Sequence, residues 1–270
     1  MKNKTLKNLF VALVFIFLFL PIVILIAYSF NTSKMNIIFE GFTLEWYKTM
    51  LTNTDLLEAF GNTMIIAITS TVVSTIIGTL GAVGLYKYNF PFKGLINKLI
   101  YIPIVIPEIV LGISLLSIYT LMKLELGMPT LILSHIAFSI PFVIVSVRSN
   151  LSPLITTYEE AAQDLGANPL NTFFKVTLPA IMPGVISGAT LSFTLSLDDV
   201  VISYFTAGPG SNTLPLKIYS MIKTGITPDV NALSTVMLIV TIVLLTISAL
   251  YQSKSIIEGD RSWKKQYYYL

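Results

Sequence analysis

Three carboxylates fall inside long apolar stretches of this sequence. Glu108 follows Pro107, and Asp198 and Asp199 are adjacent in a run that also contains Ser196. An ionisable side chain costs about 2.5–3.5 kcal/mol to insert at the centre of a membrane-spanning helix, so such residues usually have a function. The sequence has no lysine or arginine at comparable depth. The interior is therefore predicted to be acidic, which suits a cation and disfavours sulfate, phosphate or molybdate.

Each of these residues also has a structural interpretation. Adjacent residues on a helix point about 100° apart, so Asp198 and Asp199 cannot both face one pore. We expect one to contact substrate, with Ser196 as a supporting hydroxyl, while the other pairs with a partner chain or caps a broken helix. A polar lock between subunits is the alternative for the pair. For Glu108 the alternative is a structural carboxylate beside Pro103 and Pro107.

A second candidate contact is the aromatic pair Trp46 and Tyr47, which lies beside Glu45 outside the apolar stretches. Such a pair can hold an amine by cation–π attraction worth about 0.5–2 kcal/mol. It can equally anchor the chain at a membrane surface. We favour the anchor for Tyr47 and keep Trp46 as a substrate or partner contact. The single histidine, His135, is expected to be a packing residue.

The composition excludes most other classes of protein. Of 270 residues, 54% are hydrophobic and only 11% charged, and mean hydropathy is +0.78, so a soluble enzyme is excluded. The absence of cysteine and the single histidine exclude thiolate metal sites, disulfides and histidine metal clusters. Gly78, Gly81 and Gly84 are followed by no Gly-Lys-Ser/Thr, so they are predicted helix-packing sites rather than a phosphate loop. We therefore expect no enzymatic activity, no ATP hydrolysis and no cofactor in this chain.

The elements that must position these residues are membrane spans. A span needs roughly 20 apolar residues to cross about 30 Å of hydrocarbon. Six stretches qualify, and they predict an all-α membrane protein that forms a single domain over residues 1–270: Leu9–Tyr28, Asn62–Tyr86, Leu99–Met122, Thr130–Val147, Ala180–Phe205 and Ala232–Tyr251.

Basic residues predict the orientation of the spans. With both termini in the cytoplasm, 12 lysines and arginines fall in cytoplasmic segments and only 5 (Lys34, Lys48, Lys123, Lys217 and Lys223) fall outside. This asymmetry is typical of cytoplasmic loops. The net charge of +3 is thus explained by a membrane and not by nucleic acid.

The cytoplasmic loop over residues 148–179, between spans four and five, is predicted to contain two short helices. Gly166 is a helix stop and Asn168-Pro169 a turn. Apolar side chains in the second helix, Leu170 to Val176, would form a protruding surface that fits a groove on another protein.

The same loop carries a spacing that resembles the EAA motif of ATP-binding-cassette (ABC) importer permeases. The motif E-A-A-x3-G-x9-I-x-L-P is matched by Glu160, Ala161, Ala162, Gly166, Val176, Leu178 and Pro179, with valine in place of isoleucine. The resemblance implies a type I ABC importer permease fold, in which this loop forms coupling helices that bind the ATPase subunit. A short interfacial helix without a partner is the alternative.

Other segments are similar to the C-type permeases of bacterial spermidine/putrescine ABC importers. They include Leu191–Val200, Thr206–Gly210, Leu214–Met221 and Asn231–Ser234. The resemblance implies a bacterial inner-membrane complex in which this subunit works with a homologous B-type permease, two ATPase copies that bind ATP and Mg²⁺, and an extracytoplasmic polyamine-binding protein. The substrate would be a polyamine, with Asp198, Asp199 and Glu108 as cation contacts. Alternatives are an ABC permease for another cationic or small organic solute, a proton-coupled secondary amine carrier, and a membrane scaffold without transport.

Overall fold

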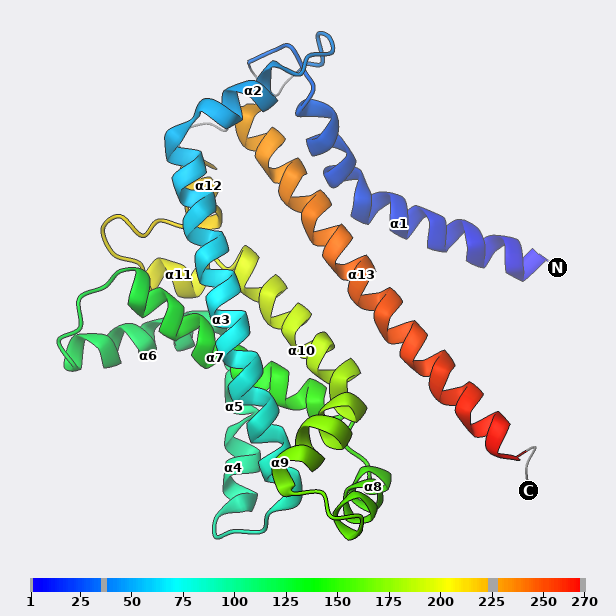
Figure 1. The fold of residues 1–270 in the computed structure, drawn as a ribbon. Coiled ribbons are helices and arrows are strands. Elements are labelled where there is room, and N and C mark those ends of the chain that lie inside the picture. Colours follow the sequence, from blue (N-terminus) through cyan, green and yellow to red (C-terminus); the bar gives the residue numbers. More distant parts are fainter. Residues whose placement is uncertain (1, 35–37, 223–227, 268–270) are drawn as a thin grey trace. The chain divides into compact units, whose positions relative to one another are not determined.

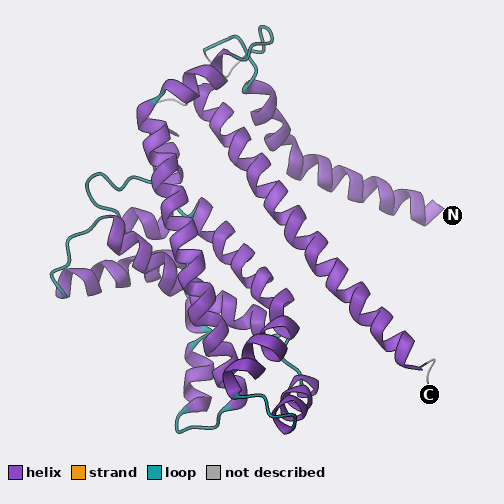
Figure 2. Ribbon diagram, in the orientation of Figure 1, coloured by secondary structure: helices purple, strands orange, loops and turns teal. Residues whose placement is uncertain are grey.

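The computed structural model describes residues 2–34, 38–222 and 228–267, and helices are the regular elements throughout these ranges apart from one β-bridge between Asn31 and Phe42 (Figure 2). Met1 and residues 268–270, the ends for which the sequence predicts a cytoplasmic position, lie outside them. The chain divides into two compact units. The first is Met1–Glu58 with Lys217–Ile242, and the second is Ala59–Leu216 with Val243–Leu270.

The first unit contains α1 (Lys2–Tyr28), α2 (Glu45–Thr52), α12 (Leu214–Ile222) and the start of α13 (Pro228–Tyr267). The segment between α1 and α2 is held by Asn31, which is fully buried. Its amide donates to the carbonyl of Ile38 at 2.7 Å and accepts from the N–H of Glu40 at 2.9 Å. These bonds satisfy the buried amide and tie Asn31 to Ile38 and Glu40.

The second unit contains most of α3 (Thr54–Lys87), the helices from α4 to α11, and α13 from Val243 onward (Figure 1). Its apolar core joins side chains of α3, α7, α8 and α10, namely Ala82, Val83, Leu85, Val143, Ile144, Val147, Ile155 and Ile181. The remaining helices are α4 (Lys93–Leu99), α5 (Ile102–Val105), α6 (Glu108–Leu121), α7 (Met128–Arg148), α8 (Pro153–Asp164), α9 (Pro169–Thr172), the π-helix η1 (Phe173–Thr177), α10 (Leu178–Asp198) and α11 (Val201–Thr206).

Close approaches at glycine bring α7 against its neighbours. A Cβ on Gly78 of α3 would lie 2.7 Å from the side chain of Val143, and one on Gly188 of α10 would lie 3.0 Å from the Cα of the same residue. Small residues at such positions allow helix backbones to approach closely. Gly81 also meets α7, through Ile144, whereas a Cβ on Gly84 would meet no described atom within 4 Å.

Five unbroken helical stretches in the described residues are long and apolar enough to span a membrane: Leu6–Tyr28, Thr54–Lys87, Met128–Arg148, Pro169–Asp198 and Pro228–Leu250. The sixth predicted span is a bent pair, Lys93–Val105 and Glu108–Leu121, with an angle of 110° between its parts. The all-α membrane fold is therefore confirmed, and the described residues contain six spans if the bent pair is counted as one. The third span, predicted over Leu99–Met122, is divided into two helices between Val105 and Glu108.

Proline causes the break in this pair. Ile106 and Pro107 have ψ values of 137° and 134°, which are extended. Proline lacks an N–H and disfavours the helical conformation of the residue before it. Glu108 consequently occupies the first position of α6.

The fifth span also differs from its predicted range of Ala180–Phe205. It ends early, because α10 stops at Asp198 and Asp199 is extended with ψ 126°. It begins early as well, since helix continues from Pro169 through η1 into α10. The part of the loop from Pro169 onward and the fifth span are therefore one connected helix.

The two-helix prediction for the loop over residues 148–179 is otherwise confirmed. The first helix, α8, ends at Asp164, and Gly166 has a left-handed φ of +87° that suits glycine. Asn168 caps α9, accepting a hydrogen bond from the N–H of Asn171 at 2.8 Å.

Candidate functional site

The candidate site lies where the two broken spans of the second unit meet. Helix α11, which follows the break in span five, packs against α6, which follows the break in span three. A Cβ on Gly112 of α6 would lie 2.7 Å from the ring of Phe205 in α11. The hydroxyl of Thr130, in α7, donates to the carbonyl of Thr206 at 2.9 Å. These contacts hold α11 against two helices, so both breaks belong to one packed region.

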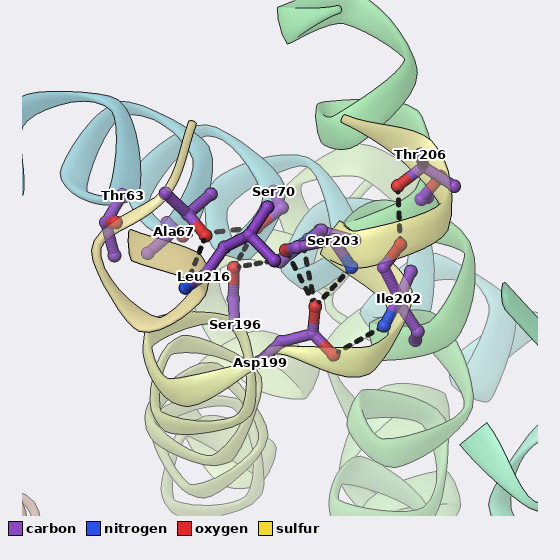
Figure 3. Close-up of polar contacts among 12 residues, drawn as sticks. Thr63, Ala67, Ser70, Ser196, Asp199, Ile202, Ser203, Thr206 and Leu216 are labelled. Carbon is purple, nitrogen blue, oxygen red and sulfur yellow. Dashed lines mark hydrogen bonds and ion pairs between the residues drawn. The ribbon is translucent and has the colours of Figure 1, made fainter. Parts of the chain in front are cut away.

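Asp199 caps the new helix at the break (Figure 3). Its carboxylate accepts hydrogen bonds from the N–H of Ile202 at 3.1 Å, the N–H of Ser203 at 2.7 Å and the hydroxyl of Ser203 at 2.8 Å. The first N–H groups of a helix have no intrahelical acceptor, and an aspartate at this point supplies one. Of the two roles expected for the adjacent aspartates, Asp199 takes the capping role.

His135 is part of the same structure, and sequence reasoning gave it only a packing role. The side chain is 1% exposed. Its Nδ1 lies 2.6 Å from the hydroxyl of Ser196, its Nε2 lies 3.2 Å from the hydroxyl of Ser203, and Nε2 is 3.5 Å from the carboxylate of Asp199. His135 thus joins α7 to both sides of the break in span five.

Two serines of α3 bond to this region from the other side. Ser70 pairs with Ser196 at 3.2 Å, and Ser74 pairs with Ser192 at 3.0 Å. We call Ser70, His135, Ser196, Asp199 and Ser203 the polar cluster. The predicted substrate contact Ser196 is 3% exposed, and its hydroxyl bonds to two members of this cluster. The repeated spacing of four residues in Ser70/Ser74 and Ser192/Ser196 is the signal in the sequence that could have indicated a polar helix–helix contact.

Asp198 and Glu108 differ from Asp199 because both side chains are exposed in this chain. They lie close enough for their charges to repel each other. The ion pairs formed by the described residues involve neither of them. The two breaks thus bring together two carboxylates that are 90 positions apart in the numbering and available to a positively charged ligand.

Trp46 belongs to the other unit, at the start of α2. Its indole N–H donates to the backbone carbonyl of Asn31, and the hydroxyl of neighbouring Tyr47 lies 2.8 Å from that of Ser29. The rings of Phe30 and Tyr47 are 5.2 Å apart. Both aromatic residues therefore connect α2 to the residues that directly follow α1. The role of Trp46 as a substrate or partner contact stays a prediction.

The motif residues of the coupling loop lie mainly at the surface. Glu160, Ala161, Gly166 and Pro179 are exposed, while Ala162, Val176 and Leu178 are half-buried. Large apolar side chains surround them, with Leu165 90% exposed, Leu170 70% and Phe174 60%. An apolar surface of this kind on two short helices is typical of a protein-binding site.

Comparison with known proteins agrees with this architecture. Residues 74–254 match the family described as binding-protein-dependent transport system inner membrane component. The chain is 42% identical over 250 residues to the spermidine/putrescine transport system permease protein PotC of Escherichia coli K12, covering 93% of this chain and 95% of that protein. It is 40% identical over 232 residues to the putrescine transport system permease protein PotI of the same strain, covering 83% and 82%.

A solved structure has the same fold at low sequence identity. It is that of the bacterial alginate ABC transporter in complex with its alginate pentasaccharide-bound periplasmic protein, and it matches with a TM-score of 0.65 at 16% identity, covering 92% of this chain and 93% of that one. Helices broken at the depth of a membrane are tolerated where they line a cavity or are buried in protein, as the packed breaks of this chain are. On these grounds the chain belongs to the family of binding-protein-dependent transport system inner membrane components, the multi-pass permease subunits of ABC importers.

Proposed function

We propose that this chain is the permease subunit of an ATP-driven importer for polyamines such as spermidine and putrescine. The observation that carries the proposal is the pair of exposed carboxylates, Asp198 and Glu108, at the two adjoining helix breaks. A polyamine is a short rod of ammonium groups. Carboxylates that are free of basic partners bind such groups by charge-assisted hydrogen bonds. The names of the two relatives, which mention spermidine and putrescine, support the same substrate class.

In this proposal the residues at the breaks have separate tasks. Asp198 and Glu108 contact the ammonium groups directly. Asp199 and Ser196 act through the polar cluster, which fixes the end of α10 and therefore the position of Asp198. Trp46 contributes on the outer side, as a contact for substrate or for the binding protein.

The partners follow from the family and from the exposed coupling loop. We propose that residues 1–270 form one permease domain, which pairs with a homologous B-type permease in the bacterial inner membrane with both termini in the cytoplasm. An ATPase dimer binds Glu160–Gly166 and the apolar surface around Leu170, and it alone binds ATP and Mg²⁺. An extracytoplasmic polyamine-binding protein delivers the substrate.

Transport then proceeds by alternating access. The loaded binding protein docks outside, and ATP closes the ATPase dimer, which moves the loop at residues 148–179. Because the helix is continuous from Pro169 to Asp198, movement of the loop displaces the carboxylate of Asp198 directly. A ligand can shift the equilibrium between two conformations only if its contacts differ between them. The carboxylate of Asp198, at the end of a helix that moves, makes different contacts with the substrate in the two conformations.

Uptake by the reconstituted complex tests the proposal. The chain is co-purified with its partner permease, ATPase and binding protein, and labelled spermidine and putrescine uptake into proteoliposomes is measured with and without ATP. We expect uptake that needs ATP and the binding protein and is unaffected by collapse of a proton gradient. Uptake that follows the proton gradient without ATP would indicate a secondary carrier, and ATP-driven uptake of another solute alone would refute the polyamine assignment.

A further inference from the structure

Glu159 is a buried carboxylate in the coupling loop that the motif does not include. It is 5% exposed, and Ile155, one helical turn earlier, is 6% exposed. Residues four apart lie on the same face of a helix, so Ile155 and Glu159 form the inner face of α8. The next residue, Glu160, is exposed. Charged side chains are almost never this buried unless they are paired.

The partners of Glu159 come from two other elements. The ammonium of Lys87, the last residue of α3, lies 2.7 Å from Glu159 Oε1. The hydroxyl of Thr177, the last residue of η1, donates to the same oxygen. We call these three residues the Glu159 junction. It connects α8 to the cytoplasmic end of span two and to the start of α10.

The Glu159 junction attaches α8 to α3 beside a cleft. A cleft of about 720 Å³ separates parts of α3 from α8 and α9, and its lining includes Lys87, Glu159, Gly84, Gln163 and Phe173. Ile155 provides an apolar contact at the start of α8 through the core cluster. One turn later, at the edge of the cleft, the ion pair with Lys87 and the bond from Thr177 add polar contacts to the packing of α8 against α9 and η1.

The two spans that meet at Glu159 are also the spans that enclose the polar cluster. Span two contributes Ser70 and Ser74, and these bond to Ser196 and Ser192 of α10. Thr177 ends a π-helical turn, an irregularity that often occurs at functional positions in helices. A displacement of α8 would therefore be transmitted through Glu159 to α10, which ends at Asp198, and to α3, whose serines bond to α10.

We propose that Glu159 is a positioning residue that couples the ATPase to the substrate path through Lys87 and Thr177. The inference rests on the proposed function, because it requires an ATPase bound to the loop. The ATPase contacts Glu160 and the apolar surface around Leu170, and Glu159 transmits the resulting displacement of α8 to spans two and five. Without the Glu159 junction the ATPase still binds and hydrolyses ATP, but hydrolysis no longer moves the helices of the substrate path.

The test measures the amount of substrate imported per ATP hydrolysed by the complete reconstituted complex. The variants are Lys87→Met, Lys87→Arg, Glu159→Gln and the exchange Lys87→Glu with Glu159→Lys. Lys93→Met is the matched control, because Lys93 is a lysine of the same cytoplasmic segment and bonds to the neutral amide of Asn89 at an exposed site. Co-purification with the ATPase is recorded for every variant.

We expect Lys87→Met and Glu159→Gln to lower this ratio about five-fold or more, the lower range of typical coupling between sites, with the ATPase still bound. Lys87→Arg and Lys93→Met should keep the ratio, and the exchanged pair should recover part of it because the ion pair forms again with its charges reversed. A purely structural role for Glu159 would instead reduce co-purification of the ATPase and leave the ratio of the assembled complexes unchanged. An unchanged ratio in Lys87→Met refutes the inference, even if Glu159→Gln fails to assemble. If the wild-type complex imports no polyamine, the proposed function fails instead, and the two failures are thus distinguished.

Discussion

Asp198 and Asp199 are neighbours in the chain, but the end of α10 between them gives their carboxylates different surroundings. Asp199 accepts three hydrogen bonds at the start of α11, whereas Asp198 is exposed and lies near Glu108. We expect Asp198→Asn to lower polyamine uptake about ten-fold, because it weakens a charged hydrogen bond worth about 1.5–3 kcal/mol. Labelled uptake and co-purification of the ATPase measure the effect, and assembly should be intact.

Substitution of Asp199 should instead act on stability. Asp199→Ala removes the acceptor for two N–H groups of α11 and should lower the free energy of unfolding by about 0.5–2 kcal/mol, as loss of a helix cap does. Thermal unfolding of the purified complex checks this, with Asp198→Ala as the matched control expected to unfold at the wild-type temperature. A normal unfolding temperature in Asp199→Ala, together with lost uptake, would make Asp199 the substrate contact.

We expect His135 to stabilise the break in span five as much as Asp199 does. His135→Ala would remove the hydrogen bonds to Ser196 and Ser203, and a typical hydrogen bond contributes about 0.5–1.5 kcal/mol to stability. The unfolding temperature should therefore fall, while His135→Gln, which retains both a donor and an acceptor, should recover part of the loss. Equal unfolding temperatures for His135→Ala and wild type would contradict the role of the polar cluster.

The sequence revealed the carboxylates of this site but not the partners of the histidine. A charge within an apolar run stands out because of its insertion cost, and this applies to Glu108, Asp198 and Asp199 without any knowledge of the fold. The bonds of His135 reach residues 61 and 68 positions away, so they depend on the packing of α7 against α10 and α11. The separate roles of the two aspartates were unpredictable for the same reason, since the break that divides them is stabilised by that packing.

At the scale of elements, residue types predicted the helix ends that depend only on neighbouring residues. Gly166 ends a helix and Asn168 begins the next, as their residue types predict. The continuation of helix from α9 into α10 was missed, because the sequence there contains prolines at Pro179 and Pro183 that usually end or bend a helix. Pro179 lies within the first turn of α10, where a missing N–H is tolerated.

We expect the backbone conformation of the turn between α8 and α9 to control how ATP hydrolysis is coupled to transport. Gly166 has φ +87° and nothing within 4 Å of a Cβ position, so a side chain there is strained by conformation and not by contact. Gly166→Val should cost about 1–2 kcal/mol, as left-handed conformations do for residues other than glycine, and should shift α9 relative to α8. We expect uptake per ATP hydrolysed to fall in reconstituted complexes.

Gly166→Asn is the matched control, since asparagine tolerates the left-handed conformation far better than valine. It should couple nearly as well as wild type. Equal loss in both variants would mean that the side chain obstructs the ATPase surface, and full transport by Gly166→Val would remove the turn from the coupling path.

At the scale of the whole molecule, much apolar surface is left for lipid and other chains. The span Leu6–Tyr28 is the extreme case, because none of its most apolar window is buried within the described residues. A helix that is apolar all round is stable only in a membrane or against other protein. This agrees with the family description of an inner membrane component of a transport system.

Orientation in the membrane is the last property that the distribution of charge predicts. The natural chain has no cysteine, so single introduced cysteines can be labelled without removing any native residue. Lys4→Cys and Lys265→Cys lie in segments predicted to be cytoplasmic, and Glu125→Cys lies between spans three and four in a segment predicted to be external. Basic residues near span ends are retained on the cytoplasmic side. A membrane-impermeant thiol reagent should therefore label Glu125→Cys in intact cells and the other two only in inside-out vesicles. Labelling of Lys4→Cys in intact cells would invert the topology and move the loop of Glu159 and Glu160 to the side of the membrane that has no ATPase.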